Sequence, residues 1–157
     1  MIGFLMCNFI EDGLDISFRV QENICNTYLE VNFNQVVGAD VKDLENVIGS
    51  IDSIVEEYEI EKVYYYGDTF NILDWVLSIN AIDSDFMNNI VDIREALAVV
   101  AKDEDRKTSD RILMSNVNKI FAMIDNDFMV KDTEKNLEYL TQMVSELCKK
   151  HSCLAEI

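Results

Sequence analysis

The sequence predicts an α/β fold: a mixed sheet with antiparallel N-terminal strands, followed by strands that crossover helices connect. Two observations predict it. Apolar residues follow strand-like spacing up to about residue 33 and helix-like spacing after Asp40. A short aromatic and β-branched segment then interrupts the helical spacing at residues 62–66. The 157 residues include no Pro and no Gly- or Ser-rich linker, so we expect a single domain, residues 1–157.

The N-terminal segment predicts three antiparallel strands. Residues 2–10 form an almost wholly apolar run, typical of a buried strand. A turn signal follows and ends at Gly13, where glycine supplies a permissive backbone. Residues 14–20 alternate apolar and polar side chains, which predicts a half-buried strand, and residues 28–33 predict the third.

The middle of the chain predicts a helix, a strand and a second helix. Asp40 is placed to cap a helix that ends near Tyr58, because apolar residues recur there at spacings of three and four. Residues 62–66 predict a fourth strand. The helix expected over residues 70–79 carries Trp75, which we expect in the core.

The C-terminal part is predicted to be mainly helical. A short strand or turn near residues 90–91 leads into a helix through residues 96–100. The charged residues 103–107 predict a solvated loop. Two further helices are expected at about residues 110–124 and 133–150, giving the order β-β-β-α-β-α-(β)-α-α-α.

Charge restricts the classes of partner. Thirteen Lys and Arg against 30 Asp and Glu give a net charge of −17, which argues against nucleic acid as a partner because phosphates are repelled. Residues 1–61 alone carry −11, so we expect a protein with a basic surface to bind there; the alternative is that the acidity only maintains solubility. No apolar run reaches eighteen residues and no basic leader precedes residues 2–10, so we expect a cytoplasmic protein without a membrane span. The oligomeric state stays open.

The four cysteines are expected to be reduced thiols. Cys148, His151 and Cys153 have a spacing that weakly suggests zinc, for which Cys7 or Cys25 would supply the fourth ligand. We favour the alternative that Cys7 and Cys25 pack as small apolar side chains. His151 is expected near a frayed C-terminus.

The element order and three local patterns resemble the ribonuclease H-like 3′–5′ exonucleases, whose metal site uses four acidic residues. The family's first strand ends in Asp-x-Glu before two small polar residues and Gly-Leu. Here Gly13-Leu14 is in register, while Asn8 and Ile10 stand at the two acidic positions.

The other two patterns follow the fourth strand and lie on the last helix. The family commonly has His-Asn-x-x-Phe-Asp after that strand, and this chain keeps Phe70 but has Asn71 at the acidic position. The family's last helix has a His five residues before an Asp. Lys131 and Asn136 hold those two places here. The resemblance implies a ribonuclease H-like, exonuclease-like fold in which the catalytic acids have been lost.

The substitutions at these positions argue against catalysis. Two-metal hydrolysis needs several anionic oxygens to hold two divalent cations close together. Asn8, Asn71 and Asn136 each offer one neutral carbonyl oxygen, Ile10 offers none, and Lys131 is expected to be a cation rather than a general base. We therefore expect a non-catalytic pseudo-exonuclease that needs no cofactor.

The alternative is a divergent metal-dependent 3′–5′ exonuclease that acts on single-stranded nucleic acid. It would build a shifted Mg²⁺ or Mn²⁺ site from neighbouring carboxylates, namely Glu11, Asp12, Asp68 and Asp132.

Seven carboxylates in and after the helix expected from Asp40 are the predicted binding residues, and we call them the acidic surface: Asp43, Glu45, Asp52, Glu56, Glu57, Glu59 and Glu61. Such a density of one charge favours fast, salt-dependent association with a basic protein. Inhibitors and immunity or anti-defence proteins act by protein–protein binding of this kind. A structural or oligomer-forming subunit is a third alternative.

Overall fold

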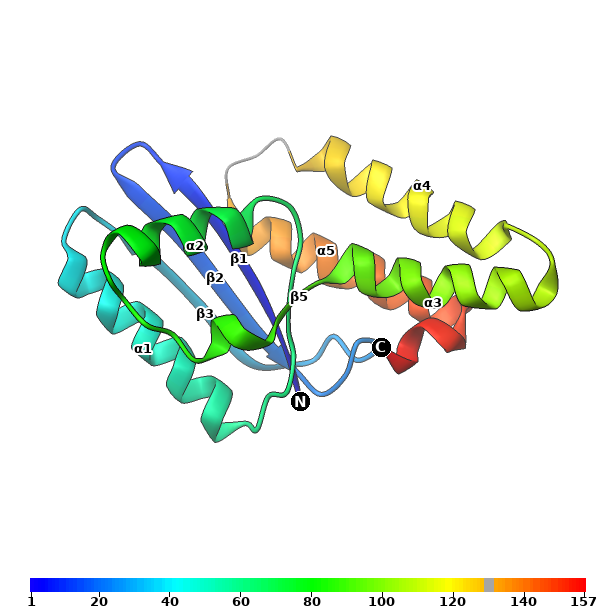
Figure 1. Cartoon of the computed structure of the whole chain (residues 1–157), viewed down its shortest axis with the longest axis horizontal. Coiled ribbons are helices and arrows are strands. Elements are labelled where there is room, and N and C mark those ends of the chain that lie inside the picture. The colour runs from blue at the N-terminus through cyan, green and yellow to red at the C-terminus, as the bar shows by residue number, and fades with distance from the viewer. Residues whose placement is uncertain (129–131) are drawn as a thin grey trace.

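The computed structural model describes residues 1–128 and 132–157, and its centre is a five-stranded mixed sheet of order β3-β2-β1-β4-β5 (Figure 1). Strands β1 (Ile2–Ile10), β2 (Gly13–Gln21) and β3 (Leu29–Val37) pair antiparallel. Strands β4 (Val63–Tyr65) and β5 (Ile90–Asp92) continue the sheet parallel to β1. The structure confirms the predicted α/β class, the antiparallel N-terminal strands and the crossover connections.

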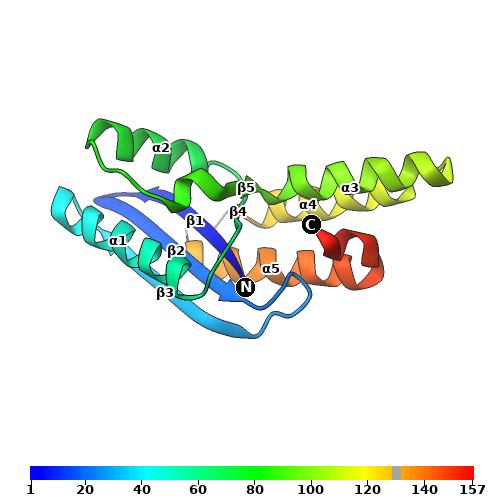
Figure 2. The same cartoon turned by 60° about the horizontal axis from the view of Figure 1, so that its bottom comes forward.

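Helices cover both faces of the sheet and enclose two apolar cores. Helices α1 (Val41–Glu57) and α2 (Thr69–Ile79), with the 3₁₀ helix η1 (Phe86–Asn89), pack on one face against residues such as Leu5 and Ile16. Helices α3 (Ile93–Thr108), α4 (Ile112–Asp127) and α5 (Thr133–Lys150) pack on the other face, and α3 and α4 extend beyond the sheet (Figure 2). In the described part of the chain, no helix combines the length and apolarity needed to cross a membrane.

Strand β2 is buried on both faces, so the prediction of a half-buried strand was wrong. Its apolar side chains face α1 and α2, whereas its polar side chains face α5. Those polar side chains are at most 9% exposed, and they are Asp15, Ser17, Arg19 and Gln21. Helix α5 contacts β1 and β2 and shields this polar row from water.

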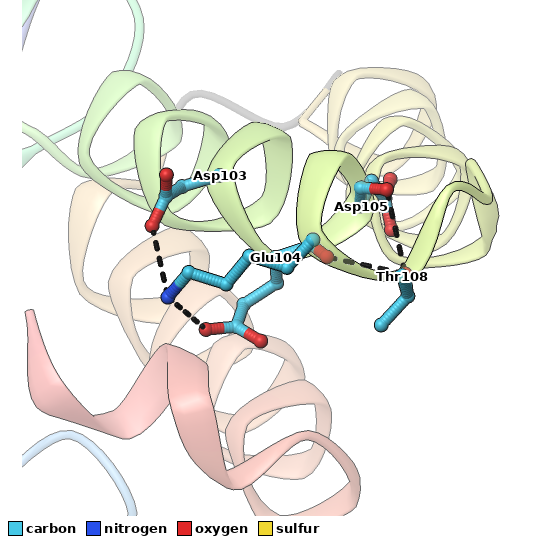
Figure 3. Close-up of polar contacts among 5 residues, drawn as sticks. Asp103, Glu104, Asp105 and Thr108 are labelled. Carbon is cyan, nitrogen blue, oxygen red and sulfur yellow. Dashed lines mark hydrogen bonds and ion pairs between the residues drawn. The ribbon is translucent and has the colours of Figure 1, made fainter.

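The predicted loop at residues 103–107 was also wrong, because these residues form the last turns of α3. Lys107 Nζ lies 3.4 Å from carboxylate oxygens of both Asp103 and Glu104, which point toward one amine (Figure 3). Charged pairs three and four residues apart support a helix rather than end it. The turn comes later, at Ser109, whose backbone is left-handed with φ 58°.

Two further expectations about exposure were wrong. Trp75 is 57% exposed rather than in the core, because Leu73, Val76 and Leu77 form the buried side of α2. The C-terminus is not frayed: residues after α5 form a second 3₁₀ helix, η2 (Ser152–Glu156), and its Leu154 is fully buried against the α3–α5 core.

Candidate functional site

The most connected polar site lies where the β1–β2 hairpin meets the first turn of α5. Asp15 on β2 is 9% exposed, and both of its carboxylate oxygens accept hydrogen bonds. Oδ2 accepts from the backbone N–H of Thr133 at 3.1 Å, and Oδ1 accepts from Asn34 Nδ2 at 3.0 Å. A carboxylate at a helix N-terminus is stabilised by the unpaired amides there, so Asp15 attaches the start of α5 to the sheet.

Hydroxyl groups complete this polar site. Ser17 Oγ lies 2.7 Å from Thr133 Oγ1 and accepts a 2.7 Å hydrogen bond from Asn34 Nδ2. On the same strand, Arg19 is 8% exposed and its Nε has no hydrogen-bond partner among the described residues. Burial lowers the pKa of Arg19, and the charges of Glu138 and Glu134 on α5 oppose that shift.

Two of the predicted degenerate positions lie near this site. Asn8 is the direct β1 partner of Asp15, so the two side chains share one face of the sheet. Asn136 is 6% exposed and lies one turn after Thr133 on α5. Asn71, in the first turn of α2, is exposed, and Ile10 is half-buried at the end of β1. Lys131 lies outside the described residues.

The chemistry of the site is that of a structural hydrogen-bond network. The groups that hydrogen-bond at Asp15, the strand partner of Asn8, and at the adjoining Ser17 are the Asn34 side-chain amide, the Thr133 hydroxyl and the Thr133 backbone N–H. Both oxygens of the Asp15 carboxylate already accept hydrogen bonds. A metal bound there would have to compete with the N–H groups of Thr133 and Asn34.

The carboxylates of the alternative metal site are distributed over three places. Glu11 and Asp12 are exposed in the β1–β2 turn, and Asp68 is exposed at the start of α2. Asp132 caps α5 by accepting from Lys135 N at 3.1 Å. Within residues 1–128 and 132–157, no group of three or more His, Cys, Asp and Glu side chains is placed to hold a metal ion.

Two of the four thiols, Cys7 and Cys148, are buried, and Cys25 and Cys153 are half-buried. Burial raises the pKa of Cys7 to about 12, and the Asp15 charge adds to the shift. Burial likewise raises the pKa of Cys148 to about 12. Cys7 and Cys25 pack against the two apolar cores, which confirms their predicted role as small apolar side chains. His151 Nε2 lies 3.2 Å from Asn116 Nδ2.

Six of the seven side chains of the acidic surface are exposed to solvent. All except Asp52 are exposed: Asp43, Glu45, Glu56, Glu57, Glu59 and Glu61. Asp52 is half-buried, and its Oδ1 accepts from Phe86 N at 3.0 Å and from Ser84 Oγ at 3.2 Å. Asp52 therefore anchors the segment before η1 to α1, a structural role that the sequence did not indicate.

Two features of the surface were missed by the sequence analysis. Phe9 and Trp75 are both exposed, and their rings make an edge-to-face contact with centroids 6.2 Å apart. A cavity of about 730 Å³ lies between α3 and α4, and four of its lining residues are cations: Lys102, Arg106, Arg111 and Lys119. The helical period of α2 places Trp75 opposite the buried residues of that helix, so the sequence does contain a signal for the exposure of Trp75.

Comparisons with known proteins give no relative from which to transfer a function. Neither a scan against protein-family models nor a search of curated proteins finds a match to this chain.

Proposed function

We propose that this chain is a non-catalytic, exonuclease-like protein that acts by binding a protein partner with a basic surface. The observation that carries the proposal is the exposed part of the acidic surface on and after α1. Residues 40–61 hold eight carboxylates and one cation, Lys42, a net charge of −7 over 22 residues. Such a surface accelerates encounter with an oppositely charged protein and repels phosphates.

The exonuclease-like fold is part of this proposal. The resemblance implies antiparallel N-terminal strands followed by strands that crossover helices connect. The sheet has three antiparallel strands and then two strands parallel to β1, each reached through a helix on one face. Gly13-Leu14 opens β2 directly after the turn, where the resemblance aligns the family's Gly-Leu. These features support the resemblance without a family match.

The non-catalytic character is supported by the side chains at the sheet end. Asn8 and Asn136 bring neutral amides to the neighbourhood where the resemblance implies metal-binding acids. Asp15, the one buried carboxylate beside Asn8, is already used to hold the first turn of α5. A site with few anionic oxygens binds a pair of divalent cations weakly.

The binding part of the proposal is tested by charge reversal. Glu45, Glu56 and Glu57 are exposed and are replaced together by Lys. A matched control reverses three exposed acids on α3, α5 and η2, Glu95, Glu146 and Glu156, and changes the net charge equally. Pull-downs from the source cell identify a partner, whose association rate is then measured at about 50 and 300 mM salt, where the Debye length falls from roughly 14 to 6 Å.

We expect the α1 reversal to slow association at least tenfold at low salt, and the control reversal to slow it much less. An association rate that depends on neither the salt concentration nor the α1 reversal would show that the acidity serves solubility alone.

The non-catalytic part is tested with Mg²⁺ and Mn²⁺ on single-stranded DNA and RNA, where we expect no cleavage. Cleavage that disappears in Asp15→Asn or Asn8→Ala would instead support the metal-dependent exonuclease.

A further inference from the structure

A group of large apolar side chains is exposed near the start of α1, the end of that helix that carries Asp43 and Glu45 of the acidic surface. We call it the apolar patch, and it comprises Phe9 at 47% exposure, Val41 at 40%, Trp75 at 57% and Ile79 at 60%. Val41 belongs to α1, and Trp75 and Ile79 belong to α2, the two helices that pack on one face of the sheet. Phe9 is on β1, in the alternating set of side chains that includes Leu5 and Cys7 and faces these helices. Single exposed apolar residues are common, but a cluster that includes the chain's only Trp is typical of an interaction site.

A groove of about 340 Å³ adjoins the patch. Phe9 and Val41 line it directly. Val76 lines it from α2, the helix of Trp75 and Ile79, and Asn80 lines it from the C-cap of that helix. Its floor includes Leu14, Val37 and Leu44, which are at most 6% exposed. The groove is large enough to receive one or two apolar side chains, while the exposed rings provide contact area around it.

The rim of the groove and patch is acidic. Glu11 and Asp40 line the groove, and Asp12, Asp43 and Asp74 are exposed next to residues of the groove or the patch in the chain. Lys42 is the one cation adjacent to a patch residue in the sequence. A ligand of this site must therefore combine apolar side chains for the centre with positive charge for the rim.

The charge also decides between occupants. A second copy of the chain would bring another net charge of −17 to an already acidic rim, and nucleic acid would bring phosphates. Both are repelled at this end of the molecule. An amphipathic segment rich in Lys or Arg is attracted, and its apolar side chains gain by covering Trp75, Phe9 and Ile79.

We infer that the apolar patch and its groove form the docking site for a cationic, amphipathic segment of a partner protein, with apolar anchors between Phe9, Trp75 and Ile79. This inference rests on the proposed function, since it names the contact at which an acidic binding protein holds its basic partner. It adds a specific requirement: the partner needs apolar anchors, and charge alone does not suffice.

Trp75 makes the test direct, because the fluorescence of the only Trp reports on occupancy of the patch. The probe is an 18-residue amphipathic helical peptide of Leu and Lys, titrated into the full chain while the Trp emission maximum is followed. We expect a saturable blue shift as Trp75 leaves water. A peptide with Glu in place of Lys should give no shift, and a peptide with Ser in place of Leu should bind at least tenfold more weakly.

Variants then locate the site. Phe9→Ser and Ile79→Ser remove apolar area without changing charge, and each should weaken the Leu/Lys peptide about tenfold, as loss of an anchor residue does. Val99→Ser is the matched control, because Val99 is 69% exposed on α3, away from the patch. Circular dichroism checks that each variant is folded. The two variants are made separately, so if one of them does not fold, the other still tests the docking site.

The outcomes separate this inference from the proposed function. If Phe9→Ser and Ile79→Ser bind the peptide within twofold of wild type while the Glu45, Glu56 and Glu57 reversal abolishes binding, the docking site is wrong and the acidic binding surface stands. If Val99→Ser weakens binding as much as the patch variants, the site is also wrong. If neither the patch variants nor the charge reversal change the affinity, both proposals fail.

Discussion

Asp105 shows how one buried carboxylate joins two helices. It lies in the last turns of α3 and is 7% exposed, and its oxygens accept from the backbone N–H groups of Leu113 at 3.1 Å and Met114 at 2.8 Å. These amides belong to the first turn of α4, where no residue of the helix itself can accept them. The side chain thus supplies an N-cap from a different helix, and it fixes the turn between α3 and α4.

Replacing Asp105 should therefore destabilise the protein more than replacing its exposed neighbour. We expect Asp105→Ala to lower the free energy of unfolding by about 1–3 kcal/mol, because one buried and one partly buried backbone N–H lose their acceptor. Asp103→Ala removes only an exposed ion pair with Lys107 and should cost about 0–1 kcal/mol. Urea denaturation of the two variants measures both values. Equal losses would contradict the capping role.

At the scale of elements, Gly13 and Gly49 have opposite effects on stability. A Cβ added to Gly13, the first residue of β2, would lie 1.9 Å from the carbonyl oxygen of Val37 at the end of β3. The glycine is thus required for close approach of two strands, whereas a permissive backbone was the reason expected from the sequence. A Cβ added to Gly49 meets no atom within 4 Å in the interior of α1.

We expect Gly13→Ala to shift the end of the sheet and to lower the free energy of unfolding by more than about 1 kcal/mol. Gly49→Ala should raise it by about 0.5–1 kcal/mol, because glycine is a poor helix former. Thermal or urea unfolding of both variants gives the comparison. A Gly13→Ala variant as stable as wild type would mean that the Val37 carbonyl moves away at little cost.

Helices and strands could be predicted where the pattern that indicates them involves only residues close together in the sequence. The alternation in β2 and the spacing of three and four in α1 and α5 depend on neighbours in sequence, so those elements were predicted close to their observed positions. The charges of residues 103–107 were misread, because a charged run on a helix surface resembles a loop in composition. The pairs of Lys107 with Asp103 and Glu104 distinguish the two.

The candidate site was only partly predictable, because its contacts join distant parts of the chain. The hydrogen bond from Thr133 to Asp15 spans 118 residues, and no local pattern indicates it. The available signal is the row of polar residues on β2 from Asp15 to Gln21. Alternation alone predicts that such a row faces solvent, whereas α5, distant in the sequence, covers it. Trp75 was misplaced for the opposite reason: aromatic size predicts burial, but the helix period exposes it.

At the scale of the whole molecule, charges of the two signs are unevenly distributed. Residues 40–61 carry a net −7, whereas residues 102–119, at the joined ends of α3 and α4, carry a net +1 and include the four cations that line the cavity there. In the described part of the chain, the only ion pairs are the two of Lys107. With so few ion pairs to offset it, repulsion among the exposed carboxylates should lower the free energy of unfolding.

Salt should consequently stabilise this protein. Raising NaCl from about 20 to 300 mM shortens the Debye length from about 20 to 6 Å and screens the repulsion between exposed carboxylates. We expect Tm to rise by several degrees, since about 1 kcal/mol corresponds to about 2–4 °C in chains of this size. Replacing the exposed Glu56, Glu57 and Glu61 by Gln should raise Tm at low salt and reduce the increase on adding salt. Replacing the exposed Lys149 and Lys150 by Gln makes the net charge more negative and should do the reverse. Calorimetry at the two salt concentrations measures all three proteins, and a Tm that falls as salt is added would show that attraction between charges outweighs the repulsion described here.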